Sequence, residues 1–206
     1  VFIYKQSDFD DIPDKPWVYW MSEYMRKLFV TCDLMEKGAK PRQGLATADN
    51  KRFLRFWWEV GKPLLGLGFA DRLTAKESGG KWFPYMKGGT PCAWFGNQSN
   101  VLNWKADGAE IDGFPRAVIR NPDYYFRRGV TWSDVSSKGF AGRLSPGGFI
   151  HDVKGMTCYP SESEIPFVLG LFNSRIVKFI VSALNPTISY QVGDIERLPV
   201  PNSRSP

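Results

Sequence analysis

The sequence predicts an α+β fold: a β-rich domain with an N-terminal amphipathic helix and a long C-terminal helix. Three observations predict it. Twenty glycines and fifteen prolines in 206 residues favour many turns and short elements over a helical bundle. Apolar residues recur at helical spacing near both ends of the chain. Between them, short aromatic runs are punctuated by turn residues, as in strands and hairpins.

The N-terminal helix is expected within "PWVYWMSEYMRKLF", residues 16–29. Trp17, Trp20, Tyr24 and Leu28 are spaced by three and four residues, which places them on one face of a helix. We expect that face to point inward.

A second helix is expected after a loop that begins at residue 41, with Asp49 or Asn50 as its cap. Its inward side would consist of Phe53, Phe56 or Trp57, and Val60. The chain is therefore expected to divide into a helical N-terminal segment, 1–60, which packs on a second part, 61–206.

The second part should begin as strands and end as a helix. Gly-Gly, Phe-Pro and Asp-Gly pairs separate the aromatic runs of residues 79–108, and the pattern continues to about residue 159. Ser161 and Glu164 then match a capping box, and a helix over about 163–185 should close the domain. Its expected inward residues are Leu169, Phe172, Ile176, Phe179, Ile180 and Leu184.

Positive charge is concentrated in the middle of the chain. The net charge is +6, and residues 41–160 hold seventeen Lys/Arg against ten Asp/Glu. The range 116–143 combines six basic residues with several aromatic ones, a composition typical of surfaces that meet phosphates and bases together. A solvated basic face explains the same composition.

The cysteines and the histidine exclude the usual zinc frameworks. Cys32, Cys92 and Cys158 are far apart, no Cys-x-x-Cys pair occurs, and His151 is the only histidine. No metal site is expected, and reduced thiols favour a cytoplasmic protein. The N-terminus does not resemble a signal peptide, and Arg175 and Lys178 interrupt the longest apolar stretch.

Residues 121–124, Asn-Pro-Asp-Tyr, differ at one position from the Asn-Pro-Pro-Tyr tetrad that binds a flipped-out adenine in DNA N6-adenine methyltransferases. A catalyst would also need a Gly-rich turn after an early strand to bind S-adenosylmethionine. Gly66-x-Gly68 is followed by "TAKESGGKWF" rather than by a crossover helix. We therefore interpret the tetrad as a turn, and expect neither catalytic residues nor a cofactor in this segment.

Five motifs in order carry a family resemblance: "IPDKPWVYWMSEYMRKLF", "PRQGLATADNKRFLRFWWEV", "KWFPYMKGG…WFGN…VLNW", "RNPDYYFRRGVTWSDVSSKGFAGRLSPGGFIHDV" and "LGLFNSRIVKFIVSALNPTISYQVGDIERLPVP". From about Ile12 to Pro201 the chain resembles the C-terminal half of the BREX phage-defence adenine methyltransferases (PglX). It is more distantly similar to type IIG restriction–modification enzymes, and its last motif also resembles the ends of recognition domains in type I specificity subunits. One departure is Ala48, where relatives often have glycine before the aspartate.

The resemblance implies a role in target recognition rather than in catalysis. In this family the donor site for S-adenosylmethionine and the Asn-Pro-Pro-Tyr tetrad lie in an N-terminal methyltransferase domain, outside the part that matches. The parent would be an S-adenosylmethionine-dependent adenine-N6 DNA methyltransferase, and residues 61–206 its DNA reader. The implied partners are double-stranded DNA, the methyltransferase domain of the same parent chain, and a possible phage-encoded DNA mimic.

Candidate DNA contacts follow from side-chain chemistry. Basic residues would bind phosphates and fix the register, and amide or guanidinium groups on loops would read base edges in the major groove. The candidates are Arg42, Lys51, Lys87, Asn97, Gln98, Asn100, Arg116, Arg120, Arg127, Arg128, Ser137, Lys138 and Arg143.

Two other function classes stay open from the sequence. The eight tryptophans and eight tyrosines would suit a carbohydrate-binding module, and the basic surface would suit a protein-docking module with an acidic partner. Salt separates the first from DNA binding, because DNA affinity falls steeply as salt rises.

Overall fold

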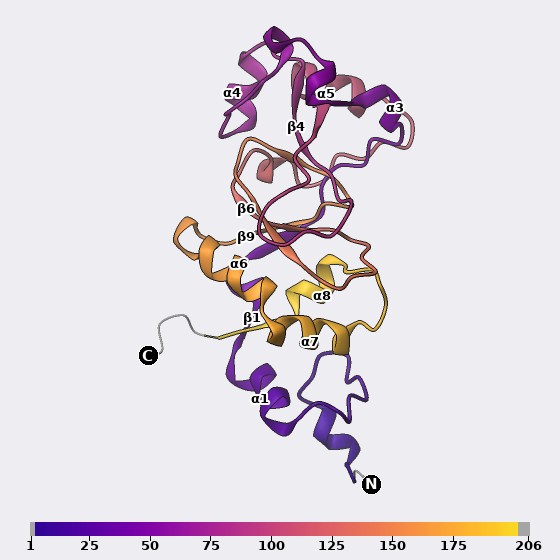
Figure 1. The fold of residues 1–206 in the computed structure, drawn as a ribbon, viewed down its shortest axis with the longest axis vertical. Coiled ribbons are helices and arrows are strands. Elements are labelled where there is room, and N and C mark those ends of the chain that lie inside the picture. Colours follow the sequence, from indigo (N-terminus) through magenta and orange to yellow (C-terminus); the bar gives the residue numbers. More distant parts are fainter. Residues whose placement is uncertain (1–2, 202–206) are drawn as a thin grey trace.

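The computed structural model describes residues 3–201 and shows an elongated molecule built around two four-stranded sheets (Figure 1). The lower sheet of Figure 1 has the order β2-β9-β6-β7, and the upper sheet has the order β3-β5-β4-β8. A two-stranded pair, β1-β10, accompanies the lower sheet. We call the parts built on these sheets the lower and upper halves. The mixed α+β class expected from the sequence is confirmed.

The elements are short. The strands are β1 (Asp33–Leu34), β2 (Lys40–Arg42), β3 (Leu54–Phe56), β4 (Trp82–Met86), β5 (Asn100–Asn103), β6 (Gly129–Trp132), β7 (Gly142–Ser145), β8 (Ile150–His151), β9 (Thr157–Tyr159) and β10 (Pro199–Val200). The α-helices are α1 (Glu23–Thr31), α2 (Met35–Gly38), α3 (Asn50–Phe53), α4 (Arg72–Glu77), α5 (Lys105–Asp112), α6 (Ile165–Asn173), α7 (Arg175–Leu184) and α8 (Val192–Glu196). The 3-10 turns are η1 (Gln6–Phe9), η2 (Trp57–Glu59), η3 (Lys62–Leu64), η4 (Pro122–Tyr124) and η5 (Glu162–Glu164).

The chain passes between the two sheets several times. Strand β2 pairs with β9 in the lower sheet, and β3 pairs with β5 in the upper sheet. Later, β7 in the lower sheet is followed by β8 in the upper sheet and then by β9 in the lower one. The expected boundary near residue 60 stays a prediction, but residues 40–42 and 54–56 on its N-terminal side are strands of the two sheets. Residues 1–2 and 202–206 of the expected segments lie outside the described residues.

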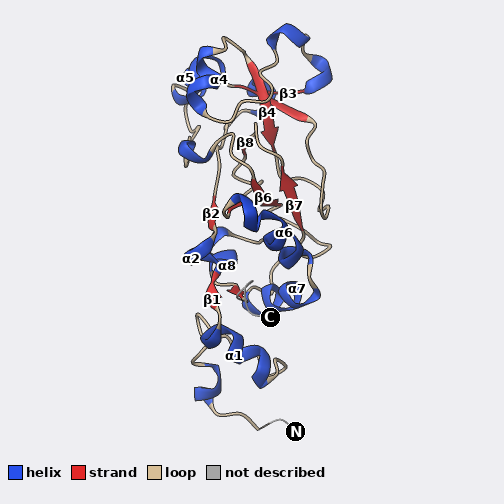
Figure 2. Cartoon of the chain, turned by 90° about the vertical axis from the view of Figure 1, so that its left-hand side faces the viewer, coloured by secondary structure: helices blue, strands red, loops and turns tan. Residues whose placement is uncertain are grey.

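Each half has its own apolar core. In the lower half Trp132, Phe140 and Phe172 pack together, with ring centroids 5.2–6.3 Å apart. Helix α6 approaches β7 closely, because a Cβ added to Gly142 would lie 2.7 Å from Phe172. In the upper half Phe53, Phe83 and Trp104 belong to a separate cluster. Figure 2 shows α6, α7 and α8 around the lower sheet and α4 and α5 beside the upper one.

The N-terminal helix begins later than the sequence predicts. It starts at Glu23, because the Ser22 hydroxyl accepts a hydrogen bond from the Met25 amide and caps it. Trp17 and Trp20 therefore precede the helix and are exposed, as is Tyr24, so the predicted inward face is wrong at these three residues. Leu28 packs against the core as predicted. The buried face carries Phe29 and Arg26, and the Arg26 guanidinium lies over the rings of Tyr4 and Phe9.

The second predicted helix is only one turn long. Helix α3 is capped by Asp49, as expected, and buries Phe53. The chain then becomes strand β3, in which Leu54 pairs with Leu102 and Phe56 with Asn100. Pairing with β5 replaces the helix, and it leaves Phe56 and Trp57 exposed rather than inward.

The long C-terminal helix is two helices bent by 68°. Ser174 interrupts it, because its hydroxyl accepts a hydrogen bond from the Val177 amide (3.1 Å) and caps α7. The bend changes which residues of α7 face inward. Ile180 is buried as predicted, whereas Ile176 and Phe179 are exposed. In residues 3–201 no single helix is long and apolar enough to cross a bilayer; this bent pair meets the criterion by length and composition only.

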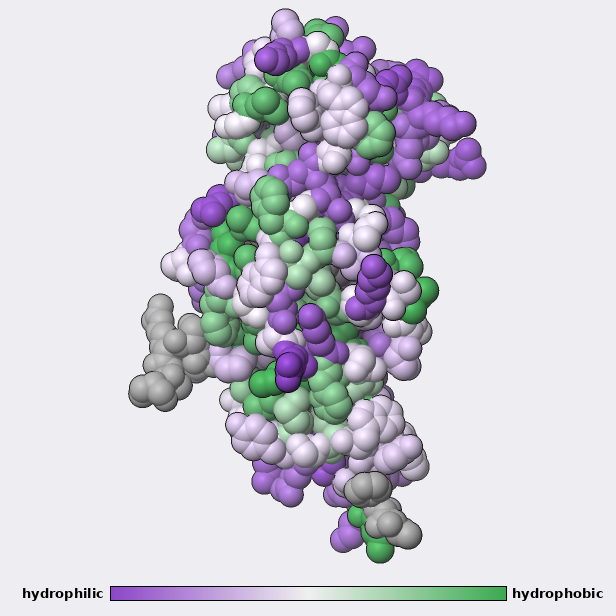
Figure 3. Space-filling view, viewed as in Figure 1, coloured by the Kyte–Doolittle hydropathy of each residue, from purple (hydrophilic) through white to green (hydrophobic). Residues whose placement is uncertain are grey.

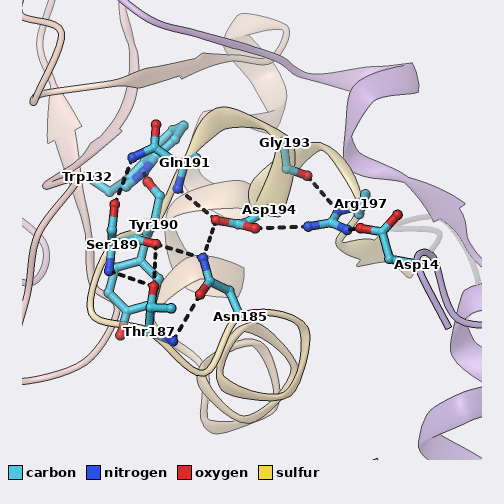
Figure 4. A network of polar contacts seen from close by, with 10 residues as sticks. All are labelled: Asp14, Trp132, Asn185, Thr187, Ser189, Tyr190, Gln191, Gly193, Asp194 and Arg197. Atoms are coloured by element: carbon cyan, nitrogen blue, oxygen red, sulfur yellow. Dashed lines mark hydrogen bonds and ion pairs between the residues drawn. The ribbon is translucent and has the colours of Figure 1, made fainter. Parts of the chain in front are cut away.

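A polar network fixes the segment that follows α7 (Figure 4). The buried Asp194 carboxylate accepts hydrogen bonds from the Gln191 amide (2.8 Å), the Asn185 side chain (2.7 Å) and the Arg197 guanidinium (2.9 Å). Arg197 also pairs with Asp14, which joins the N-terminal segment to α8. These bonds therefore fix residues 185–197 in place and connect them to the N-terminal segment.

Buried polar groups join the two halves, and we call them the polar seam. His151 of β8 shares hydrogen bonds with Ser145 of β7 (3.0 Å) and with Tyr159 of β9 (2.8 Å). Arg143 of β7 donates to the Ser133 hydroxyl (3.1 Å) and to the Lys87 carbonyl (3.3 Å), which follows β4. The two bonds of His151 and the bond from Arg143 to Lys87 cross between the halves, so the seam fixes how the halves lie relative to one another.

The carboxylate of Asp152 completes the seam. It accepts hydrogen bonds from the Tyr85 hydroxyl (2.6 Å) and the Lys154 amide (2.6 Å), and Lys87 lies 3.5 Å away. The Tyr85 hydroxyl also contacts the Leu45 carbonyl (3.1 Å). The paired buried atoms favour this arrangement, because an alternative would leave them unpaired at a cost of about 1–3 kcal/mol each. Among the described residues the Arg143 Nε is buried without a hydrogen-bond partner.

Acid should destabilise the fold through His151. Burial, with a smaller contribution from Arg143, lowers the pKa of His151 to about 3. The unfolded chain, with a pKa of about 6.5, binds a proton that the folded chain excludes. Stability is therefore fully present above pH 6.5 and falls as the pH drops towards 3. Between pH 6.5 and 5 we expect a loss of about 2 kcal/mol in the free energy of unfolding, measured by urea denaturation.

The control is His151→Asn, in which the side chain no longer titrates. Its stability should be lower at pH 7 but nearly constant from pH 6.5 to 5, since this is the only histidine. A parent protein whose stability is equally flat over that range would contradict the assignment of a neutral, buried imidazole.

Candidate nucleic-acid interface

An open groove of about 670 Å³ lies where the two halves meet. Its basic residues are Lys40, Arg127 and Arg128. The remaining lining is Gly68, Phe69, Ala70, Tyr124, Phe126, Pro146, Gly147, Gly148, Tyr159, Pro160, Ser161 and Glu162. Arg127, Arg128 and Lys40 thus line one concave surface, although Lys40 is far from the others in sequence.

The strand order explains this convergence. Lys40 pairs with Tyr159, and Gly129 pairs with Ser145. The starts of β2 and β6 and the ends of β7 and β9 therefore lie at the same end of the lower sheet. Phe126 holds the two arginines there, since it is buried in the upper core. It adopts a left-handed φ of 69°, which turns the chain towards β6.

The two arginines are held by different partners. Arg128 forms an ion pair with Glu162 (2.8 Å) that is about half exposed, and such pairs contribute little to stability. Arg127 is exposed, and its guanidinium lies 5.3 Å from the centre of the Tyr124 ring. Arg42 lies 5.4 Å from the same ring. Both groove arginines can therefore turn towards a phosphate at little energetic cost.

The Asn-Pro-Asp-Tyr segment is a turn, as interpreted from the sequence. Asn121 has a left-handed φ of 50° and donates its side-chain amide to the Gln43 carbonyl (2.9 Å), so that amide is not aimed at a ligand. Asp123 points into solvent, with 88% of its side chain exposed. The Tyr124 ring contacts Tyr159, with centroids 4.9 Å apart, in addition to the two guanidinium groups. A stacked adenine would have to displace these neighbours.

The basic residues of 116–143 do not form one surface. Arg127 and Arg128 precede β6, whereas Ser137 and Lys138 are exposed beyond its other end. Arg143 is fully buried, because its pairing with Thr131 of β6 turns its side chain into the polar seam. Its expected DNA contact stays a prediction, and in this conformation its guanidinium does not reach the surface.

Other expected phosphate contacts have mixed positions. Arg116 and Lys51 are exposed, and the surface around α3, which carries Lys51, is strongly hydrophilic in Figure 3. Arg120 is half-buried, and its carbonyl accepts the Tyr125 hydroxyl (2.8 Å). Lys87 is occupied by Asp152. Arg42 is half-buried, 3.6 Å from Glu196.

The expected base-reading amides are used by the fold. Asn97 donates to the carbonyls of Gly88 (3.0 Å) and Thr90 (2.9 Å), which closes its own loop. The Gln98 amide nitrogen is buried and has no hydrogen-bond partner among the described residues. Asn100 is half-buried in β5. In this conformation the amide donors of Asn97 and Gln98 are not available to read base edges.

The sequence did not nominate Lys40 or the Pro146–Gly148 turn, which both line the groove. A signal was present: Lys40 is two residues from Arg42, and "PGG" marks a turn of bare backbone. Within residues 3–201 no three His, Cys, Asp or Glu side chains gather as a metal site would require.

Replacing Asn121 tests the structural role of the tetrad. Asn121→Ala removes the hydrogen bond to Gln43 and places an ordinary side chain in the left-handed region. We expect the free energy of unfolding to fall by about 2 kcal/mol in urea denaturation. Asn121→Gly removes the same bond without the backbone strain, so it should recover about half of that loss. Equal stability of the Ala variant and the parent would contradict the assignment.

The sequence of this chain is similar to segments of two known proteins. No family model matches the chain. It is 32% identical, over all of its length, to "Adenine-specific methyltransferase PglX" of Lacticaseibacillus casei (strain Zhang), and 34% identical over 95% of its length to "Adenine-specific methyltransferase BrxX" of Escherichia coli O9:H4 (strain HS). It spans only 18% and 16% of the length of these two proteins. Over at least 95% of its length the chain is thus similar to one short segment of these PglX and BrxX proteins.

Proposed function

We propose that this chain is the DNA sequence-recognition segment of an adenine-specific DNA methyltransferase in a phage-defence system, and that it does not itself carry the catalytic site. The groove of Lys40, Arg127 and Arg128 is the observation that supports this most strongly. The relatives are named methyltransferases, and the chain matches less than a fifth of each. In this proposal S-adenosylmethionine binds elsewhere in the parent chain, in a methyltransferase domain that the reader contacts, and the protein acts in the cytoplasm.

The groove suits the backbone of a duplex. Arg127 and Arg128 are adjacent, project from a rigid turn, and have neighbours that water can replace. Phosphate contacts by such residues fix the register of a protein on DNA without reading its sequence. The bare backbone of Gly147 and Gly148 lets a strand approach closely. An acidic DNA mimic encoded by a phage would compete for the same groove.

The double variant Arg127→Ala/Arg128→Ala tests the groove. We expect it to bind mixed-sequence duplex DNA more weakly than the parent. The slope of log affinity against log salt is negative, and each lost phosphate contact reduces its magnitude by about 0.9. Losing two contacts should therefore reduce the magnitude by about 2. Fluorescence anisotropy over a salt series measures both quantities.

The matched control is Lys5→Ala/Lys27→Ala, which removes two charges from the N-terminal part of the molecule, at the bottom of Figure 1. It should keep the affinity and salt slope of the parent. If the two double variants behave alike, the groove is not the DNA site. A parent that binds an oligosaccharide and shows no salt dependence would favour the carbohydrate-binding alternative.

The second part of the proposal concerns the methyl donor. We expect isothermal titration of the 206-residue chain with S-adenosylmethionine to give no saturable heat. A donor site needs a Gly-rich turn after a strand, whereas Gly66-x-Gly68 follows the 3-10 turn η3. Binding of one donor molecule per chain would overturn the assignment of this segment as non-catalytic.

A further inference from the structure

The loop between β4 and β5 exposes two adjacent aromatic side chains. Within residues 88–99, here called the aromatic loop, Trp94 is 55% exposed and Phe95 is 63% exposed. This loop carries the amides of Asn97 and Gln98, which are turned inward. The side chains of this loop that a partner can contact are therefore the two aromatic rings rather than the two amides.

The backbone of the aromatic loop is clamped. The Trp94 amide donates to the Gly142 carbonyl (2.9 Å), and the Leu144 amide donates to the Trp94 carbonyl (2.9 Å), so Trp94 extends the edge of the lower sheet beside β7. The Asn97 side chain closes the loop from within. Trp94 also has a left-handed φ of 71°.

Such strain is maintained only where surrounding contacts hold it, and it concentrates at binding and active sites. The backbone that carries the two rings is therefore held in place, so it has little conformational entropy to lose when a ligand binds.

The electrostatic surroundings favour a polyanion. Residues 88–106 and 135–151 contain no Asp or Glu. The guanidinium of Arg143, the residue that pairs with Trp94, is buried, and within residues 3–201 no carboxylate pairs with it. Lys138 is exposed in a turn that the Ser136 hydroxyl closes on the Gly139 carbonyl (2.5 Å), shortly before Gly142. The aromatic loop and the segment that pairs with it thus contribute positive side chains, Lys138 and Arg143, and no carboxylate.

We propose that Trp94 and Phe95 stack on, or insert between, the bases of bound duplex DNA. The inference rests on the proposed function, since it needs DNA as the partner. Aromatic and other apolar wedges partly unstack base steps, and they bend the duplex towards further protein contacts. The loop would then act by deforming DNA, which makes the energy of binding depend on how easily the sequence deforms.

The variant Trp94→Ala/Phe95→Ala tests this with two measurements on one duplex. The duplex carries 2-aminopurine, whose fluorescence rises when it is unstacked. With the parent protein we expect salt-dependent binding and a rise in fluorescence. With the variant we expect affinity to fall about tenfold or more, the salt slope to stay unchanged, and the rise to disappear. Trp94→Phe, which keeps an aromatic ring, should restore much of both signals.

The matched control is Trp17→Ala/Trp20→Ala, which removes two exposed aromatic rings from the N-terminal segment and should leave both signals as in the parent. If Trp94→Ala/Phe95→Ala binds and unstacks DNA as the parent does, the wedge is wrong while the proposed function stands, and the loop contacts something other than DNA. If the parent shows no salt-dependent DNA binding, the proposed function and the wedge both fail. Thermal melting confirms that each variant is folded.

Discussion

The polar seam is the constraint on which the rest of this structure depends. Two apolar cores, each built on its own sheet, would be free to shift if only apolar surface joined them. The hydrogen bonds of His151 with Ser145 and Tyr159, and that from Arg143 to the Lys87 carbonyl, remove that freedom. Burying a guanidinium and an imidazole costs free energy. These two groups therefore favour one relative position of the halves more than they raise the free energy of unfolding. The groove exists because the halves are held in this arrangement.

This arrangement separates two kinds of surface. One end of the lower sheet gathers Arg127, Arg128 and Lys40 beside bare glycine backbone, which suits phosphates. The edge strand β7 supports the aromatic loop, which suits bases. In the proposed complex the groove would thus position the DNA, and the aromatic loop would deform it. In the proposed function, this segment selects the DNA site while the chemistry takes place elsewhere in the parent chain.

Local signals in the sequence predicted the fold class, the turn at Asn121, the Asp49 cap and the burial of Phe172 and Ile180. They missed what depends on distant partners. The helical spacing of apolar residues continues across Ser174 without a break. The bend between α6 and α7 is therefore seen only in the structure, where α6 packs on β7. Arg143 looks like a surface residue, because an arginine is seldom fully buried, and its place in the seam comes from strand pairing. Ala48 adopts a left-handed φ of 59°, a conformation that glycine adopts without strain.

Hydrogen–deuterium exchange of the 206-residue chain with and without mixed-sequence duplex DNA at low salt locates the DNA contact without a substitution. We expect slower exchange at the groove, in residues 124–128 and 146–148, with no change in α1. Unchanged exchange along the groove while DNA is bound, or slower exchange confined to the N-terminal helix, would contradict this expectation.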